Sequence, residues 1–214
     1  MTDKVNIGCG TTPIDGWINF DNSYAIKLAN SPLLYQIAKI FKLLNKKQIE
    51  NIEWNKKHKI KFADASKIIP LKNNSAECIY TSHMLEHISR DGASMFLREA
   101  LRVLKTDGIL RISVPDLNIA IINYLKDGDA NEFMEYISVE ARPIGNLREK
   151  LQLLISGYRH HQWMYDGKSL SILMETIGFR NVKIYKKGET SIKNPKGLDL
   201  YERCEESVYV EGIK

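Results

Sequence analysis

The sequence predicts an α/β fold in which most strands run parallel. Short apolar runs that fit buried strands alternate with amphipathic stretches of helical spacing, which is the pattern of a parallel sheet with crossover helices. Two glycines, Gly8 and Gly10, directly follow the first of these runs, as they do where a strand turns toward a ligand. Hydrophobic residues make up 43% of the 214, which suffices for one core, and no glycine- or proline-rich linker divides the chain. We therefore expect a single domain over residues 1–214.

The elements follow in a definite order. An amphipathic helix is expected at Arg90–Leu104, and Thr106–Gly108 should end it. A second helix is expected at Gly167–Ile177. The expected strands are Lys4–Ile7, Trp17–Phe20, Ile60–Ala63, Ala76–Thr81, Gly108–Val114, Val182–Lys187 and Ser207–Glu211.

Two helical insertions interrupt this alternation, at about 31–58 and at 116–162. The first is rich in lysine and carries apolar residues at helical spacing: Leu33, Leu34, Ile37, Ile40, Phe41 and Leu44. Such a helix can dock on its own sheet with its lysines in solvent, lie on an anionic membrane surface through residues 31–61, or close as a lid. The second insertion follows the fifth strand and should cover the site and shape the pocket for a substrate.

The segment from Val5 to Asp21 carries the clearest sign of a ligand. The glycine turn lets the backbone approach a ligand closely, and Asp21 at the end of the next strand can accept hydrogen bonds from both ribose hydroxyls. This pairing suits a cofactor that contains adenosine. A dinucleotide is disfavoured, because Pro13 replaces the third glycine of G-x-G-x-x-G and the acid follows too soon.

Several polar residues are expected to meet at one edge of the sheet. Gly8–Gly10, Asp21, Asp64 and Ser82–His83 all follow expected strands. Because ligands of such sheets bind beyond the carboxyl ends of the strands, these positions predict a single site.

Seven stretches in this order resemble the class I S-adenosylmethionine-dependent methyltransferases, and within them the small type 11-related enzymes associated with bacterial polysaccharide biosynthesis. The stretches are NIGCG with GWINFD, FADA, SHMLEHI, LREALRVLKTDGILRISVPD, HHQWMYD, LSILMETIGFRNVKI and ESVYVEGIK. The resemblance covers nearly the whole chain. It implies a Rossmann-like sheet, mostly parallel, with an antiparallel C-terminal hairpin and helices on both faces.

The same resemblance implies that S-adenosyl-L-methionine is the cofactor and S-adenosyl-L-homocysteine the product. The cofactor-binding residues that it implies are Asn6, Gly8, Cys9, Gly10, Asp21, Asp64, Ala65, Thr81, Ser82 and His83. The chain departs from the family pattern at two of its loop positions. Asn6 stands where an acid is usual, and Thr12 replaces the third loop glycine, with the helix behind it nearly deleted.

Methyl transfer to an oxygen needs aligned reactants and benefits from a base, a role that histidine fills near neutral pH. The catalytic candidates are His83, His160 and His161, each of which could instead be a loop histidine that satisfies backbone groups. For His87 and Glu86 we expect structural roles. The candidates for binding the acceptor are Tyr158, Arg159 and Tyr165.

Composition bounds the remaining function classes. A formal charge of +5 could steer an anionic acceptor, but the lysines do not alternate with aromatic residues, so we expect no nucleic acid partner. Three cysteines without ligand-like spacing indicate reduced thiols in a cytoplasmic protein and no metal site. We expect no signal peptide and no membrane span. The leading hypothesis is O-methylation of a small or glycan acceptor. The alternatives are a non-catalytic cofactor-binding scaffold and a membrane-surface partner.

Overall fold

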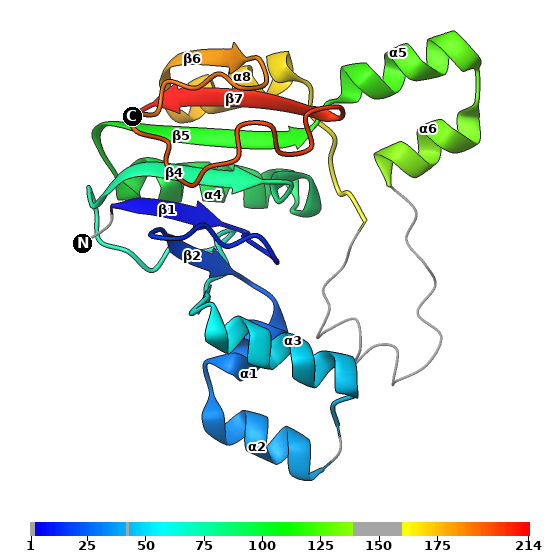
Figure 1. The fold of residues 1–214 in the computed structure, drawn as a ribbon. Helices are drawn as coiled ribbons and strands as arrows, with labels where there is room; N and C mark the ends of the chain where they lie inside the picture. Colours follow the sequence, from blue (N-terminus) through cyan, green and yellow to red (C-terminus); the bar gives the residue numbers. More distant parts are fainter. Residues whose placement is uncertain (1–2, 42, 139–159) are drawn as a thin grey trace.

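The computed structural model describes residues 3–41, 43–138 and 160–214. Its centre is a seven-stranded sheet in the order β3-β2-β1-β4-β5-β7-β6 (Figure 1). The strands are β1 (Lys4–Ile7), β2 (Ile18–Asp21), β3 (Lys61–Phe62), β4 (Ala76–Ser82), β5 (Leu104–Pro115), β6 (Arg180–Tyr185) and β7 (Ser207–Ile213).

Five of the strands are parallel and the last two are antiparallel to their neighbours. β1 pairs in parallel with both β2 and β4, and the parallel pairing continues to β3 on one side and β5 on the other. β7 runs antiparallel to β5 and to β6, which confirms the predicted C-terminal hairpin. The chain leaves β1 toward one edge and later returns beside it as β4, so strand order reverses between β1 and β4. That reversal is where such sheets bind ligands.

The main core lies between the sheet and two helices, α4 (Arg90–Val103) and α8 (Gly167–Ile177), which Figure 1 shows behind the strands. Helix α4 begins at Ser89, whose hydroxyl accepts a hydrogen bond from the Gly92 amide at 3.1 Å. It ends at Val103, one residue before the predicted end at Leu104. The strand β5 begins earlier than the predicted Gly108, because the fully buried Leu104 is already extended and pairs with Ala76 of β4.

The opposite face of β1 and β4 is covered by loop residues. Within the described ranges no helix joins β1 to β2, as the shortened segment predicts, and Ile14 and Trp17 of the connecting loop fill that place. They pack against Cys78 and Tyr80 of β4 and against Ile192 from the long connection between β6 and β7. The loop that carries the glycines is therefore fixed to the sheet by its own apolar side chains.

The first insertion forms α2 (Pro32–Ile40) and α3 (Lys46–Lys57), which gather with the preceding α1 (Tyr24–Ala29) at the end of the sheet that carries β2 and β3 (Figure 1). Buried Ala25, Tyr35 and Ile52 make a small core between them. The face of α2 on which the sequence placed its apolar contacts is instead exposed, with Leu33 at 71%, Ile40 at 73% and Phe41 at 70%. The prediction that this face docks on the sheet is therefore wrong. Tyr35 and Ala38, on the other side of the helix, are the residues of α2 that are buried.

The second insertion begins with helices α5 (Leu117–Asp127) and α6 (Ala130–Ile137), which extend past the carboxyl ends of the strands (Figure 1). The Asp116 and Asp129 side chains cap their N-termini, and Gly128 in the left-handed conformation separates them. Residues 139–159 of the predicted insertion lie outside the described residues. None of the described helices is long and apolar enough to span a bilayer.

Candidate functional site

Gly8 and Gly10 shape the turn at the end of β1. Both have positive φ angles, +70° and +49°, which L side chains rarely adopt. A Cβ on Gly8 would lie 2.6 Å from Cγ of Met84, so the turn and the end of β4 fit together only with glycine there. A Cβ on Gly10 would meet no atom within 4 Å. The turn is thus closed against β4 at Gly8 and open at Gly10, where a ligand can approach the backbone.

Asp21 lies beside this turn at the end of β2. Its Oδ2 accepts a hydrogen bond from the Gly10 amide at 3.0 Å, and its Oδ1 accepts one from the Ser23 amide at 2.8 Å. The structure therefore brings together the glycine turn and the acid that the sequence assigned to one adenosine-binding unit.

The Asn6 and Cys9 side chains serve the loop itself. The buried Asn6 amide donates to the Thr12 carbonyl at 3.2 Å and to Asn19 Oδ1 at 3.1 Å. The Cys9 side chain packs in a small apolar cluster with Ile26 and Ile60. Because the Cys9 side chain is buried, a ligand can contact only the backbone of this residue.

Asp64 follows β3 and is held by its neighbours. Its carboxylate accepts from the Ser66 hydroxyl at 2.5 Å and pairs with Lys67 at 2.8 Å. Burial raises the pKa of this carboxyl, but the hydrogen bonds from Lys67 and Ser66 outweigh it and leave the pKa below its ordinary value. Asp64 is therefore an anion near neutral pH, next to the buried Ala65.

Unpartnered hydroxyls mark the ends of the two central strands. Thr81 Oγ1 and Ser82 Oγ at the end of β4, and Ser113 Oγ on β5, are buried without a hydrogen-bond partner among the described residues. Buried hydroxyls are usually paired, so these groups point to a polar ligand. With the opening at Gly10 and the Asp21 carboxylate, they fit a nucleoside cofactor with hydroxyl and amino groups.

Three histidines surround Glu86 just beyond β4. His83 has a φ of +48°, its Nε2 is hydrogen-bonded to Ser207 Oγ at 2.8 Å, and its Nδ1 lies 3.4 Å from Glu86 Oε1. His87 follows in a single 3-10 turn, η1 (Leu85–His87), with its Nε2 3.9 Å from the same oxygen. Its ring meets that of His161 edge to face, with 5.0 Å between ring centroids.

The chain returns to this cluster at the end of the second insertion, where His160 and His161 lie. The His161 amide donates to the Ser138 carbonyl at 2.8 Å, and the Gln162 amide donates to the Glu86 carbonyl at 2.7 Å. Burial lowers the pKa of the His161 imidazole, which keeps it neutral near pH 7. The predicted acceptor contacts Tyr158 and Arg159 lie outside the described residues. Tyr165 lies in the main core, where burial raises its pKa to about 12.

Sequence reasoning missed Glu86 and Ser207 as parts of this site. The Glu86 side chain is 1% exposed, and neither carboxylate oxygen makes a hydrogen bond to a described residue. The spacing of His83, Glu86 and His87 was the available signal, because one helical turn places positions three apart on one side. Ser207 had no such signal, since it comes from β7 through a contact 124 positions away in the sequence.

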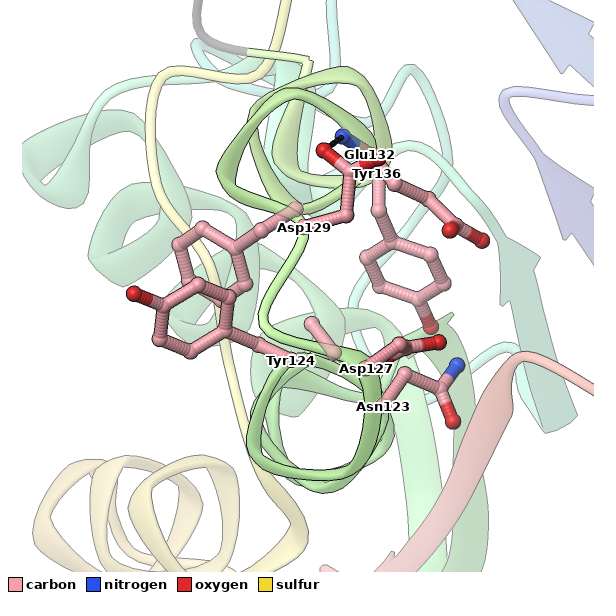
Figure 2. A pocket seen from close by; sticks show the side chains of 8 residues that line it. Asn123, Tyr124, Asp127, Asp129, Glu132 and Tyr136 are labelled. Carbon is pink, nitrogen blue, oxygen red and sulfur yellow. Dashed lines mark hydrogen bonds between the residues drawn. The ribbon is translucent and has the colours of Figure 1, made fainter.

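Figure 2 shows a pocket between α5 and α6 in the second insertion. Tyr124 and Asp127 line it from α5, and Glu132 and Tyr136 line it from α6. The Tyr136 hydroxyl donates to the Glu206 carbonyl at 2.9 Å, which ties this helical pair to the start of β7. The pocket does not include the histidine cluster; it is a feature of the cap rather than of the sheet edge.

Comparison with known proteins agrees with this geometry. A family model described as "Methyltransferase domain" matches residues 5–112, from β1 through most of β5. The chain belongs to this family. The class of enzyme predicted from the sequence, an S-adenosylmethionine-dependent methyltransferase, is thereby confirmed at the level of the family. A search of curated proteins gave no match.

Solved structures of methyltransferases share the fold. One from Thermotoga maritima is 17% identical, with a TM-score of 0.53 over 100% of this chain and 83% of its own. Another from Methanosarcina mazei is 16% identical, with a TM-score of 0.53 over 100% of this chain and 92% of its own. Both are described as S-adenosylmethionine-dependent methyltransferases. At this identity, the likeness establishes the Rossmann-like architecture of the methyltransferase domain.

Proposed function

We propose that this methyltransferase transfers a methyl group from S-adenosylmethionine to a hydroxyl of a small or glycan acceptor, as a single cytoplasmic domain of polysaccharide biosynthesis. The observation that carries the proposal is the position of the histidine cluster. His83 directly follows the unpartnered hydroxyls of Thr81 and Ser82, at the strand ends that also hold the glycine turn. A base for an oxygen acceptor therefore stands next to the cofactor groups.

The proposed cofactor contacts come from the carboxyl ends of β1, β2 and β3, on one side of the strand reversal. Asp21 binds the ribose hydroxyls, Asp64 binds the adenine amino group, and the backbone of Gly8–Gly10 lies along the methionine part. S-adenosylmethionine, when bound, supplies a methyl group already activated by its sulfonium. The remaining task of the protein is to hold the acceptor in line and to exclude water, which supplies much of the rate in such displacements.

The acceptor proton goes to a histidine of the cluster. His83 and His161 are the leading candidates, with His160 as a third, and Tyr158, Arg159 and Tyr165 are the proposed contacts of the acceptor. His83 is oriented from one side by Ser207 and from the other by Glu86, which suits a group that gains a positive charge as it takes a proton. The buried carboxylate stabilises that charge.

Calorimetric titration of the purified protein tests the first part of this proposal. We expect binding of S-adenosylmethionine and S-adenosylhomocysteine at micromolar concentration and no binding of NAD, the control nucleotide. A methyl-transfer assay with a panel of nucleotide-sugars and phosphoglycans then tests the acceptor class. Binding of the cofactor without turnover on any of them would favour the alternative, a non-catalytic scaffold. Absence of binding would contradict the proposed enzyme.

A specific observation also favours contact with a membrane surface. The exposed side chains Leu33, Leu34, Ile37, Ile40, Phe41 and Leu43, which we call the α2 face, form an apolar patch. Residues 24–61 around it contain nine lysines and two glutamates, a formal charge of +7 in a chain whose total is +5. An apolar face with a cationic surround matches an anionic bilayer, into which the side chains insert while lysines meet the headgroups.

Vesicle sedimentation tests this contact. The protein should pellet with vesicles that contain phosphatidylglycerol and not with neutral phosphatidylcholine vesicles, and high salt should reduce the pelleted fraction. The double substitution Ile40→Ser and Phe41→Ser should abolish pelleting. Leu125→Ser on α5 is the matched control, because Leu125 is equally exposed at 76% but lies outside the α2 face. Equal pelleting of both variants would contradict the contact.

A further inference from the structure

We propose that Glu86, His87 and His161 bind a divalent transition-metal ion. The three side chains come from two segments far apart in the sequence, and their ligand atoms lie within 4.8 Å of one another. Two imidazoles and one carboxylate form a recurrent donor set for such ions. The expectation of no metal site rested on the spacing of the cysteines alone and did not consider Glu86 and the histidines.

The Glu86 carboxylate is the strongest observation. It is buried at 1% exposure, yet no described residue gives either oxygen a hydrogen bond. Transfer of an ionised carboxylate from water to the protein interior without hydrogen-bond partners costs roughly several kcal/mol. A metal ion can balance this group, and so can a proton on the carboxyl group itself or on a neighbouring histidine such as His83, whose Nδ1 lies 3.4 Å away.

The ring of His87 is oriented as in a metal ligand. Its Nδ1 is 3.2 Å from the carbonyl oxygen of His160. Because a carbonyl only accepts, Nδ1 carries the hydrogen, and the neutral ring then presents the lone pair of Nε2 to Glu86. Two acceptors so placed repel each other unless a cation lies between them. A backbone carbonyl that fixes the tautomer of a histidine is the usual outer partner of a metal-bound imidazole.

The ring of His161 completes the donor set. Its Nδ1 is buried and has no hydrogen-bond partner among the described residues. The backbone of the segment is fixed at the same place, since the Gln162 amide donates to the Glu86 carbonyl and the Gln162 side chain donates to the His87 carbonyl at 2.8 Å. Both ligand segments are thus joined to each other independently of any ion.

The separations suit coordination after a small adjustment. Bonds of roughly 2.0 to 2.2 Å to nitrogen and oxygen place the ligand atoms of a tetrahedral ion about 3.4 Å apart. The atoms of the cluster, which lie within 4.8 Å of one another, need to draw in by up to about 1.4 Å, through rotation of the His87 and His161 rings. His83 stays outside the donor set, because Ser207 holds its Nε2.

The ion's role in catalysis rests on the proposed function, whereas its binding does not. Three protein ligands leave coordination positions open, as in catalytic metal sites. An acceptor hydroxyl in an open position is oriented and made more acidic by the ion. His83, beside the site, then remains the base that receives the proton. The acceptor class that suits such a site is a sugar with neighbouring hydroxyls, which can chelate the ion.

Titration of chelator-treated protein with Zn²⁺ and with Co²⁺ tests the site without any activity assay. We expect one ion per chain, with Co²⁺ giving the visible absorption of nitrogen and oxygen coordination. Glu86→Gln and His161→Gln should each weaken binding by more than the roughly 10- to 100-fold that loss of an outer partner costs. His58→Gln is the control, since His58 stacks on Trp54 in α3, away from the cluster, and should bind the ions like wild type.

The circular dichroism spectrum of each variant should match that of the wild type, which shows that weaker ion binding does not result from unfolding. The proposal would be overturned if the wild type bound neither ion, or if Glu86→Gln and His161→Gln bound the ions as tightly as the wild type. Either result would assign the balancing charge to a proton. The outcome is separable from that of the proposed function. Cofactor binding without metal binding removes the metal site alone, and metal binding without cofactor binding contradicts the methyltransferase proposal alone.

Discussion

Asn6 and Asn19 are hydrogen-bonded across β1 and β2, from Nδ2 of Asn6 to Oδ1 of Asn19 at 3.1 Å. They are direct partners in the register of the two strands. Asn19 also accepts from the Ile14 amide at 2.8 Å and donates to the Ile14 carbonyl at 3.0 Å. Parallel strands are usually joined by a crossover helix, but here a short loop joins β1 to β2, and the Asn6–Asn19 pair holds this loop in place. It explains how Asn6 can stand where the family carries an acid: here the side chain holds the cofactor loop.

Substitution of Asn19 should loosen that loop. Asn19→Ala removes the partners of the Ile14 amide and of two carbonyls in a buried place, which costs about 2 to 4 kcal/mol of unfolding free energy. Urea denaturation measures this loss, and calorimetry should show weaker binding of S-adenosylmethionine. Asn131→Ala on the exposed surface of α6 should change neither quantity. Unchanged stability of Asn19→Ala would remove the structural role given to this pair.

Asp21 should dominate cofactor affinity. Asp21→Ala deletes the carboxylate assigned to the ribose hydroxyls and frees the Gly10 amide that it now binds. Two hydrogen bonds to a charged group contribute about 3 to 6 kcal/mol together, so we expect affinity for S-adenosylmethionine to fall at least about 100-fold. The control is Asp15→Ala, an exposed carboxylate in the same loop. Wild-type affinity in Asp21→Ala would refute the proposed cofactor site.

The two loop glycines should respond differently to an added methyl group. Gly8→Ala creates both a left-handed alanine and a contact of 2.6 Å with Met84, so its melting temperature should fall by several degrees. Gly10→Ala has the unfavourable φ without the contact, and its stability should fall less. Its cofactor binding should nevertheless weaken, because the methyl group enters the open side of the turn. Thermal melts and calorimetry of both variants check these orderings.

The elements most fully predicted from the sequence are those whose pattern is local. The strand Lys4–Ile7 and the helix Gly167–Ile177 have the predicted bounds, since a buried run between turns and a capped amphipathic repeat each carry their own signal. The early start of β5 was not predicted, because Leu104 pairs with Ala76 of β4, which is its neighbour in space and not in the sequence. The prediction that the α2 face docks on the sheet was wrong, because periodicity identifies the apolar side of a helix but not what covers it.

The candidate site divides in the same way. The glycine turn, Asp21 and Asp64 follow strands, so their meeting at one edge could be derived from strand order. The environment of Glu86 could not, because its partners His87 and His161 meet only after the second insertion returns to the sheet. The sequence around a single glutamate does not indicate whether its carboxylate is buried in the folded protein. The structure was needed to show that its two oxygens lack hydrogen-bond partners in the described ranges.

Asp64 should add a small acid-dependent term to stability. Its folded pKa lies below the ordinary value of 3.8, so ionised Asp64 stabilises the fold above that pH, and the contribution is lost as pH falls through the folded pKa. Asp64→Asn should therefore be less stable than wild type at pH 6, by less than about 1 kcal/mol because Lys67 is exposed, and equally stable near pH 2. Urea denaturation at both pH values measures the difference. A difference that persists at low pH would assign it to packing.

His83 should separate binding from turnover. His83→Gln keeps a hydrogen-bonding side chain toward Ser207 but cannot take a proton, so S-adenosylmethionine should still bind while methyl transfer slows by roughly 10²- to 10⁴-fold. The pH–rate profile of the variant should lose its acid limb. Ser207→Ala leaves the imidazole in place and removes only its orientation, so its rate should fall less and the acid limb should remain. Full turnover in His83→Gln would move the role of base to His161 or to a group outside the described residues.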